Sequence, residues 1–425
     1  MSLNKPILVF EHSLLSIGDE GFTRHHWEAL GWYNEKHRGC FFSLTPKGVK
    51  FNQYVGVIQV GNITIEILPK ISRTVEKRDQ QKWQKVLIDM LRECSWMQIH
   101  AQEKAALRFR PNSILEAYLE LFIRECEDLI RQGLIKKYRT AADNCSALKG
   151  KLLFHKQIQV NAVHKERFYT QHQVFDRDNI FNQLLLKALR LIPKVTQSPF
   201  LKDRVSTLLM SFPELSDITA TTEIFQKLVF DRKSAPYREA IEIAAMLLLN
   251  YRPDISSGQN HVLAILFDMN DLWEEYIFRQ LYKNKPPEWS IKSQNSRKFW
   301  KLSGNINAKT VRPDIVLQNL DDKNSVVLDT KWKLPDNNIP ADADLKQMFV
   351  YNEYWEAKNS LLVYPNTVYT EAPIYHSGTF EKKGGSEPSH HCGIMKIAVL
   401  DKDNKYLDKT VGKRIKDFLE KVIMK

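Results

Sequence analysis

The segments Pro313-Asp314-Ile315-Val316-Leu317 and Val326-Val327-Leu328-Asp329-Thr330-Lys331 determine the fold expected for the C-terminal part of this chain. Their branched apolar residues predict two short β-strands, and the Asn and Asp residues between them favour a turn. In a hairpin centred on that turn, Asp314 lies opposite Asp329, because positions equidistant from the centre pair across the strands. Asp329 and Lys331 are two residues apart, so they point to the same face of their strand. The hairpin therefore brings two carboxylates and one ammonium group together at its open end.

Two neighbouring carboxylates repel each other, and burial strengthens the repulsion, so such a pair requires a bound cation or a shared proton. Oxygen ligands suit Mg²⁺, which keeps several waters and binds phosphate oxygens. A metal held in this way polarises a phosphoryl group and lowers the pKa of a bound water. Lys331 would then stabilise the developing charge or position the attacking water. The residues alone leave open a simpler interpretation, a surface hairpin with an ordinary Asp–Lys ion pair.

The helix expected over Asp344–Trp355 adds two further polar residues. Gln347 and Tyr351 are four residues apart and therefore lie on one face of it. Pro-Asp followed by Asp-x-Lys resembles the signature of the PD-(D/E)xK nuclease superfamily, and this Gln and Tyr resemble the helix that completes RecB-like nuclease sites. The resemblance implies that Gln347 and Tyr351 orient Lys331 or a phosphate, and that the backbone carbonyl of Thr330 is a further metal ligand.

A second helix is expected from Met269 onward, and it carries Glu274. Glu274 is a candidate third carboxylate ligand of the metal. Its alternative role is a capping pair with Asp271 at the start of the helix. The sequence leaves both roles open.

Several short runs, taken in their order along the chain, resemble the McrC family, the nuclease subunit of McrBC-type modification-dependent restriction systems. Trp273 stands where that family commonly has Phe. The runs are Tyr54–Ile58, Ile63–Lys70, Leu148–Leu152, Arg167-Phe168, Asp178–Asn182, Asp271–Glu274, Pro313-Asp314, Asp329–Lys331, Gln347–Tyr351 and Leu362–Pro365.

The resemblance implies an Mg²⁺-dependent endodeoxyribonuclease that cleaves double-stranded DNA carrying modified cytosine. It also implies a partner, a hexameric AAA+ GTPase of the McrB kind that recognises the modified DNA and whose GTPase this chain stimulates. No Walker-type phosphate loop occurs in the chain, so nucleotide hydrolysis is expected on that partner. Two alternatives stay open: a self-sufficient RecB-like nuclease, and a non-catalytic assembly factor that keeps the hairpin for folding.

Composition fits a multidomain protein that meets nucleic acid. The 425 residues carry 62 Lys and Arg against 50 Asp and Glu, for a net charge of +12. Five Cys without a Cys-x-x-Cys pair favour reduced thiols in the cytoplasm. We expect no signal peptide and no membrane-spanning segment.

The expected fold class is α+β, in three domains. Residues 1–78 form a small β-rich docking module, 79–250 a mainly helical middle domain, and 251–425 an α/β nuclease domain. Within the middle domain we expect strands at 134–138 and 151–155 on either side of a turn at 143–145.

Basic and aromatic residues alternate between the Glu274 helix and the hairpin, a pattern that fits contact with a DNA backbone. A solvated charged loop is the alternative interpretation. A zinc site is not expected at His376, His390, His391 and Cys392, because adjacent ligands give poor tetrahedral geometry. The candidate DNA-binding residues are Arg297, Lys298, Lys301, Lys309 and Arg312.

Overall fold

The computed structural model describes residues 5–71, 79–94, 96, 113–252, 261–303, 308–321, 323–335, 339–381 and 390–423. The chain is a mixed α/β, multidomain protein with two compact units, each assembled from separate stretches of sequence. One unit comprises Met1–Pro6, Ile58–Thr64 and Leu107–Ile265, and the other comprises Ile7–Val57, Ile65–Ala106 and Leu266–Lys425. The units thus differ from the three expected domains, because most of residues 1–78 belongs with the C-terminal region. The expected boundaries at 78 and 250 remain predictions.

In the second unit, the N-terminal region is rich in strands, as the sequence predicts. Strand β1 pairs in parallel with β6, with Ile7 opposite Ile65. These two strands belong to a five-stranded sheet of order β1-β6-β5-β11-β10, and the boundaries between the two units fall within β5, β6 and β11. A separate sheet has the order β2-β4-β3. The elements of the N-terminal region are β1 (Ile7–Phe10), β2 (Leu14–Ser16), α1 (Arg24–Lys36), β3 (Phe42–Thr45), β4 (Gly48–Phe51), β5 (Tyr54–Val60), β6 (Ile63–Leu68) and α2 (Gln80–Glu93). The five-stranded sheet also contains β10 (Tyr251–Arg252), which belongs to the first unit, and β11 (Val262–Asp268).

The first unit is mainly helical. Apolar residues recur at helical spacing and are buried along α3 and α5. Gly133 ends α3 with a backbone φ of 90°, as expected for a glycine stop. Pro193 lies inside α5, two residues before the helix ends at Val195. The helices are α3 (Ile114–Gln132), α5 (Ile180–Val195), α6 (Pro199–Ser211), α7 (Thr222–Gln226) and α8 (Arg238–Leu249).

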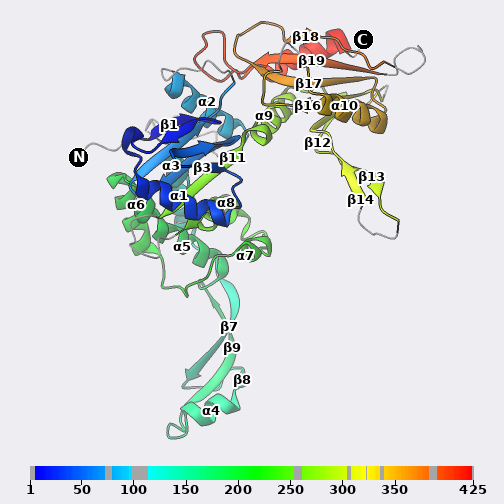
Figure 1. Cartoon of the computed structure of the whole chain (residues 1–425). Coiled ribbons are helices and arrows are strands. Elements are labelled where there is room, and N and C mark those ends of the chain that lie inside the picture. Colours follow the sequence, from blue (N-terminus) through cyan, green and yellow to red (C-terminus); the bar gives the residue numbers. More distant parts are fainter. Residues whose placement is uncertain are drawn as a thin grey trace. The chain divides into compact units, whose positions relative to one another are not determined.

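A long polar hairpin projects from these helices (Figure 1). It consists of β7 (Lys137–Cys145) and β9 (Phe168–Asp176), and its far end carries β8 (Lys151–Leu152) and α4 (Phe154–Val160). The expected turn at 143–145 is wrong, because β7 runs straight through it and pairs with β9 from Lys137–Asp176 to Cys145–Phe168. The pairing partner lies farther along the chain, so the local Asp-Asn turn signal is overridden.

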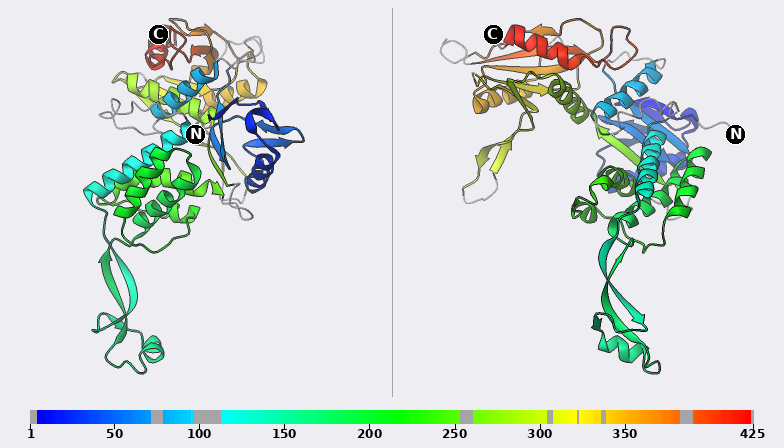
Figure 2. Two further views of the ribbon diagram at one scale, coloured as in Figure 1. Left: turned by 90° about the vertical axis from the view of Figure 1, so that its left-hand side faces the viewer. Right: turned by 180° about the vertical axis from the view of Figure 1, so that it is seen from behind.

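The C-terminal half of the second unit contains a six-stranded sheet of order β12-β15-β16-β17-β19-β18. Strands β15 and β16 form the expected hairpin, while β16, β17 and β19 run parallel to one another. A separate hairpin, β13–β14, extends from the β12 side of this sheet (Figure 2). The strands are β12 (Trp289–Ser293), β13 (Arg297–Lys301), β14 (Ala308–Val311), β15 (Ile315–Asn319), β16 (Ser325–Thr330), β17 (Asn359–Asn366), β18 (Ile374–His376) and β19 (His391–Ala398).

Helix α10 (Asp342–Trp355) is the crossover between the parallel strands β16 and β17. It packs on one face of the sheet through a cluster that contains Val316, Val327, Met348 and Trp355. Leu317 and Leu328, which alternate with the cluster residues along the strands, are also fully buried, so both faces of the sheet are covered. Helix α10 therefore lies over strands β16, β17 and β19.

Helices α9 (Met269–Asn284) and α11 (Val411–Phe418) pack closely against each other. The approach requires Gly412, because a Cβ at this position would lie 2.0 Å from the backbone oxygen of Gln280. Helix α9 carries Glu274, which is close enough to Asp314 for the charge of Asp314 to raise its pKa. No helix in the described part of the chain has the length and apolarity needed to cross a membrane.

Candidate active site

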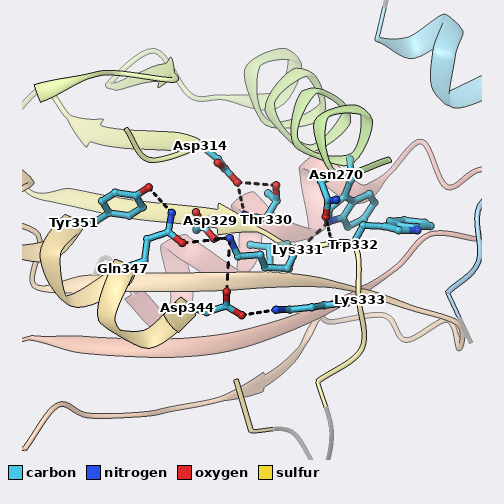
Figure 3. A network of polar contacts seen from close by, with 12 residues as sticks. Asn270, Asp314, Asp329, Thr330, Lys331, Trp332, Lys333, Asp344, Gln347 and Tyr351 are labelled. Atoms are coloured by element: carbon cyan, nitrogen blue, oxygen red, sulfur yellow. Dashed lines mark hydrogen bonds and ion pairs between the residues drawn. The ribbon is translucent and has the colours of Figure 1, made fainter. Parts of the chain in front are cut away.

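The β15–β16 hairpin brings Asp314 and Asp329 together, as its sequence predicts. The register places Ile315 opposite Leu328, and its continuation by one residue pairs Asp314 with Asp329. Asp329 is only 1% exposed at the end of β16. Figure 3 shows both carboxylates at the same end of the sheet, next to Lys331.

The Asp314 carboxylate is held by Thr330. Oδ2 of Asp314 accepts hydrogen bonds from the backbone N–H of Thr330 at 2.7 Å and from its Oγ1 at 2.9 Å. Burial raises the pKa of Asp314 despite these two bonds. Burial, and then the charge of Asp314, raises the pKa of Asp329 to about 7. Both groups therefore favour a nearby cation.

Lys331 supplies one such cation. Its Nζ lies 2.7 Å from Oδ2 of Asp329 and donates to Oε1 of Gln347 at 3.4 Å. Burial lowers the pKa of Lys331, but the charges of Asp329, Asp314 and Asp344 outweigh it and leave the pKa above its usual value. The ammonium group therefore keeps its charge at neutral pH.

Gln347 and Tyr351 lie on the same face of α10, one turn apart, as expected. Nε2 of Gln347 donates to the Tyr351 hydroxyl at 2.6 Å, and this hydroxyl donates to the backbone oxygen of Arg312 at 2.8 Å. Burial raises the pKa of Tyr351 to about 12, so the hydroxyl remains a donor. This chain of bonds ties the position of Lys331 to the backbone two residues before Asp314.

Glu274 faces the same site but does not cap its helix. The cap of α9 is Asp268, whose side chain accepts from the backbone N–H of Asn270. Oε1 of Glu274 accepts a hydrogen bond from Nε2 of Gln294 at 3.1 Å. Burial, and then the charge of Asp314, raises the pKa of Glu274 to about 7. The alternative role of Glu274, a capping pair with Asp271, is therefore wrong, and the role of metal ligand stays a prediction.

The donor set fits a hard divalent cation. Oδ1 of Asp329 is buried and has no hydrogen-bond partner among the described residues. In the same part of the chain, no group of three His, Cys, Asp or Glu side chains is arranged to hold a metal. The fit therefore rests on Asp314, Asp329 and a backbone carbonyl such as that of Thr330. Such a small oxygen set suits Mg²⁺, which retains several waters.

Several residues that support the site lie outside the sequence motifs. Asp344 is buried, lies 4.0 Å from Nζ of Lys331 and pairs with Nζ of Lys333 at 2.7 Å. Asp344 precedes Gln347 by three residues on α10, and this helical spacing could have indicated that both residues lie on the same face. Asn270 accepts from the backbone N–H of Trp332, and the Trp332 indole donates to Glu11 at 2.8 Å. No local pattern links these last pairs.

The five candidate DNA-binding residues are all exposed. They lie on or just after the β13–β14 hairpin rather than on an irregular loop, and Phe299 and Trp300 are about half exposed beside them. The base of this hairpin is anchored to α10, because Arg297 donates to the backbone oxygen of Tyr354 and lies over the Trp355 ring. The residues are Arg297, Lys298, Lys301, Lys309 and Arg312.

The His and Cys residues near β19 do not gather into a metal site within the described part of the chain. Nε2 of His390 pairs with Glu353 at 3.0 Å, and Cys392 is buried in β19. The sequence also predicts a linker at 252–258, from its Pro, Ser and Gly residues, and a loop at 380–392. Most of both segments lies outside the described residues.

Comparisons with known proteins agree with this architecture. The family model for the McrBC 5-methylcytosine restriction system component matches residues 49–365, about three quarters of the chain. The chain belongs to this family of restriction-system components.

Two solved structures share its fold. One is a chain of a half-complex from a tetradecameric assembly of Thermococcus gammatolerans McrB AAA+ hexamers with bound McrC. It has a TM-score of 0.69 and 20% identity, covering 98% of this chain and 100% of that one. A chain of the T. gammatolerans McrBC complex gives a TM-score of 0.50 at 21% identity, covering 66% and 88%. Among curated proteins, none matches.

Proposed function

We propose that this chain is a Mg²⁺-dependent endonuclease subunit that hydrolyses DNA phosphodiester bonds. One observation carries the proposal: Nζ of Lys331 lies 2.7 Å from the buried carboxylate of Asp329 and donates to Gln347. An isolated surface ion pair needs no such arrangement, whereas a nuclease site needs a cation fixed beside two carboxylates. The pKa of Asp329, raised to about 7 by burial and Asp314, supports the same interpretation.

In the reaction, a water oxygen forms a bond to phosphorus, a phosphorus–oxygen ester bond breaks, and the leaving oxygen takes up a proton. A Mg²⁺ ion bound by Asp314, Asp329 and the Thr330 carbonyl would supply Lewis-acid polarisation and a more acidic water. The ammonium group of Lys331 stabilises the negative charge that develops on the phosphoryl oxygens. Gln347 holds this ammonium group in position, and Tyr351 holds Gln347.

The partner in this proposal is an AAA+ GTPase of the McrB kind, which recognises DNA carrying modified cytosine. Membership of the McrBC 5-methylcytosine restriction family supports it, as does the fold shared with a chain of the McrB–McrC assembly. This chain has no Walker-type loop of its own. We therefore assign GTP hydrolysis to the partner and its stimulation to this chain.

The test combines the purified full chain with its cognate AAA+ ring, GTP, Mg²⁺ and a plasmid carrying 5-methylcytosine. We expect cleavage by the complex and its loss with Asp329→Ala, while gel filtration shows that the variant still assembles. Unchanged cleavage with the variant favours a non-catalytic assembly factor. Cleavage by the chain alone, at a rate that the ring does not alter, favours a self-sufficient nuclease.

The partner is tested separately by steady-state GTP turnover of the ring with and without the chain. We expect turnover to rise when the chain is added. Equal turnover in both samples removes the stimulation from the proposal and leaves the nuclease assignment untouched.

A further inference from the structure

A cavity of about 420 Å³ lies beside the candidate active site, and no residue of the site lines it. Its walls come from five parts of the second unit: strand β12, strand β15, the turn before β16, the start of β13 and the end of α10. Its size falls in the range of about 300–1,000 Å³ that is typical of small-ligand sites. Four charged side chains and one indole ring lie in these walls: Lys292, Arg297, Lys323, Glu356 and Trp355.

The cavity opens on the same face of the sheet as the two candidate catalytic carboxylates. Lys292 pairs with Val316 across β12 and β15, and Val316 pairs with Val327 across β15 and β16. Paired residues point to one face, and so do residues two apart on a strand, which places Asp314 and Asp329 on the face of Lys292. The step from Asp314 to Val316 is about 7 Å along the strand. A DNA strand advances about 3.4 Å per nucleotide, so this step corresponds to about two nucleotides.

A buried donor in the cavity wall lacks a partner. Trp355 is 5% exposed, and its Nε1 has no hydrogen-bond partner among the described residues. An indole N–H can only donate, and leaving a buried donor unpaired is costly, so the wall favours a ligand with acceptor oxygens. The Arg297 guanidinium carbon lies 4.9 Å from the centroid of the same indole ring. The guanidinium group and the indole ring, whose N–H is buried without a partner among the described residues, therefore belong to the same cavity wall.

The charge of the walls selects an anion. Lys292, Arg297 and Lys323 are cationic, and Glu356 is the one carboxylate among the lining residues. Amide and hydroxyl groups complete the polar lining, from Ser290, Asn295, Gln318, Asn324 and Ser325. Phosphate oxygens suit this combination, because cationic and N–H donors bind them with charge-assisted hydrogen bonds.

We propose that this cavity binds a backbone phosphate, with its sugar, of the DNA strand on one side of the scissile bond. The inference rests on the proposed nuclease function and assigns it a substrate subsite. Lys292 and Arg297 contact the phosphate, the Trp355 N–H donates to one of its oxygens, and Glu356 opposes it at the rim. The subsite fixes the distance between the bound strand and Lys331.

The first experiment measures DNA affinity of the full chain by fluorescence anisotropy in EDTA, so that no cleavage is needed. Lys292→Gln should weaken binding about three- to tenfold, and Glu356→Gln should strengthen it, because the two changes alter the cavity charge in opposite directions. Lys358→Gln removes another exposed lysine that does not line the cavity and should leave affinity unchanged. Equal effects of Lys292→Gln and Lys358→Gln overturn the proposal.

The second experiment locates the phosphate. A series of duplexes carries a single uncharged methylphosphonate at successive positions around the cleavage site. We expect the wild-type chain to lose affinity at one or two positions, and Lys292→Gln to be insensitive at those same positions. A variant that responds to every position as the wild type does overturns the assignment.

The third experiment observes the indole directly by ¹⁹F NMR of the chain labelled with 5-fluorotryptophan. The resonance missing from Trp355→Phe identifies Trp355, and the phenyl ring keeps the packing with Arg297. We expect that resonance to shift with DNA, and not with DNA whose critical phosphate is a methylphosphonate. If the resonance shifts with inorganic phosphate and does not shift with any of the DNA samples, the assignment of the cavity to DNA is overturned. Because these readouts need no cleavage, they are independent of the Asp329→Ala test of the nuclease itself.

Discussion

Nε2 of Gln347 donates a 2.6 Å hydrogen bond to the hydroxyl of Tyr351, one turn later on α10. This bond orients the amide so that its oxygen faces Nζ of Lys331, because the nitrogen is engaged elsewhere. The hydroxyl in turn donates to the backbone of Arg312, two residues before Asp314. Helix α10 and the segments that carry Arg312 and Lys331 are thereby joined around one ammonium group.

Tyr351→Phe removes this hydroxyl and leaves the ring in the core. Gln347 then loses its anchor, so we expect about a tenfold fall in the cleavage rate with DNA affinity unchanged, since the residue acts on position rather than on binding. Single-turnover cleavage separates the two quantities. Tyr282→Phe, which removes an exposed hydroxyl from α9, serves as the control and should behave as the wild type. An equal loss in both variants would contradict the positioning role.

Lys331→Gln removes the charge beside Asp329. We expect cleavage to fall by about 10²-fold or more, the cost typical of removing one donor that stabilises transition-state charge. Lys346→Gln, an exposed lysine of α10 next to Gln347, is the matched control. The measurement is the rate of plasmid cleavage by the complete complex, with assembly checked by gel filtration. Retention of activity by Lys331→Gln would exclude the proposed role.

Asp329→Asn tests the metal without any activity measurement. Mg²⁺ binds only the folded wild-type site, so saturating Mg²⁺ should raise the melting temperature of the wild type by about 2–5 °C. The variant keeps the size of the side chain but loses its charge, so we expect no rise. A calorimetric scan with and without Mg²⁺ gives both values, and Ca²⁺ serves as a second hard cation. An equal rise in both proteins places the Mg²⁺ site elsewhere.

Glu11→Gln tests a buried carboxyl group that lies behind the site. Burial is the main cause that raises the pKa of Glu11 from 4.5 to about 8, while bonds from Lys70 and Trp332 lower it. The folded chain therefore holds a proton that the unfolded chain has released, and this stabilisation is lost as the pH rises from about 4.5 through about 8.

The loss is on the order of 1 kcal/mol per pH unit across that window. Gln is neutral at every pH and keeps an oxygen to accept from the Trp332 indole and the Lys70 N–H. We expect the unfolding free energy of the variant to depend less on pH between 6 and about 8.5 than that of the wild type. Urea titrations at several pH values provide the comparison, and parallel pH profiles would rule out a neutral Glu11.

The β13–β14 hairpin is tested through the salt dependence of DNA binding. Replacing Lys298, Lys301 and Lys309 by Gln should weaken binding and reduce the slope of log K against log salt concentration by about one per lost phosphate contact. The control replaces three exposed lysines elsewhere in the unit, and its slope should stay unchanged. If both triple variants lose the same slope, the effect reflects net charge alone. The control positions are Lys402, Lys405 and Lys413.

The hairpin and its site could be predicted because their signals are local. Two apolar runs around a polar turn fix the register that pairs Ile315 with Leu328. A shift of β16 by one residue would move its apolar side chains, and Asp329 with them, to the opposite face of the sheet. Gln347 and Tyr351 follow from helical spacing alone. Strand β7 shows the limit of prediction from local signals. Residues 143–145 carry a local turn signal, but the strand continues through them because it pairs with Phe168–Asp176, which lies more than 20 residues farther along the chain.

By itself, the sequence determined which groups share a strand or a helix face, because the periods of those elements fix the direction of each side chain. The tertiary structure decided what those groups meet across long sequence distances. Trp332 bonds Glu11, Asp268 rather than Asp271 caps the Glu274 helix, and the proposed phosphate cavity combines residues from 290 to 356. It also decided the raised pKa of Asp329, because desolvation depends on what covers a group and not on its neighbours in the chain.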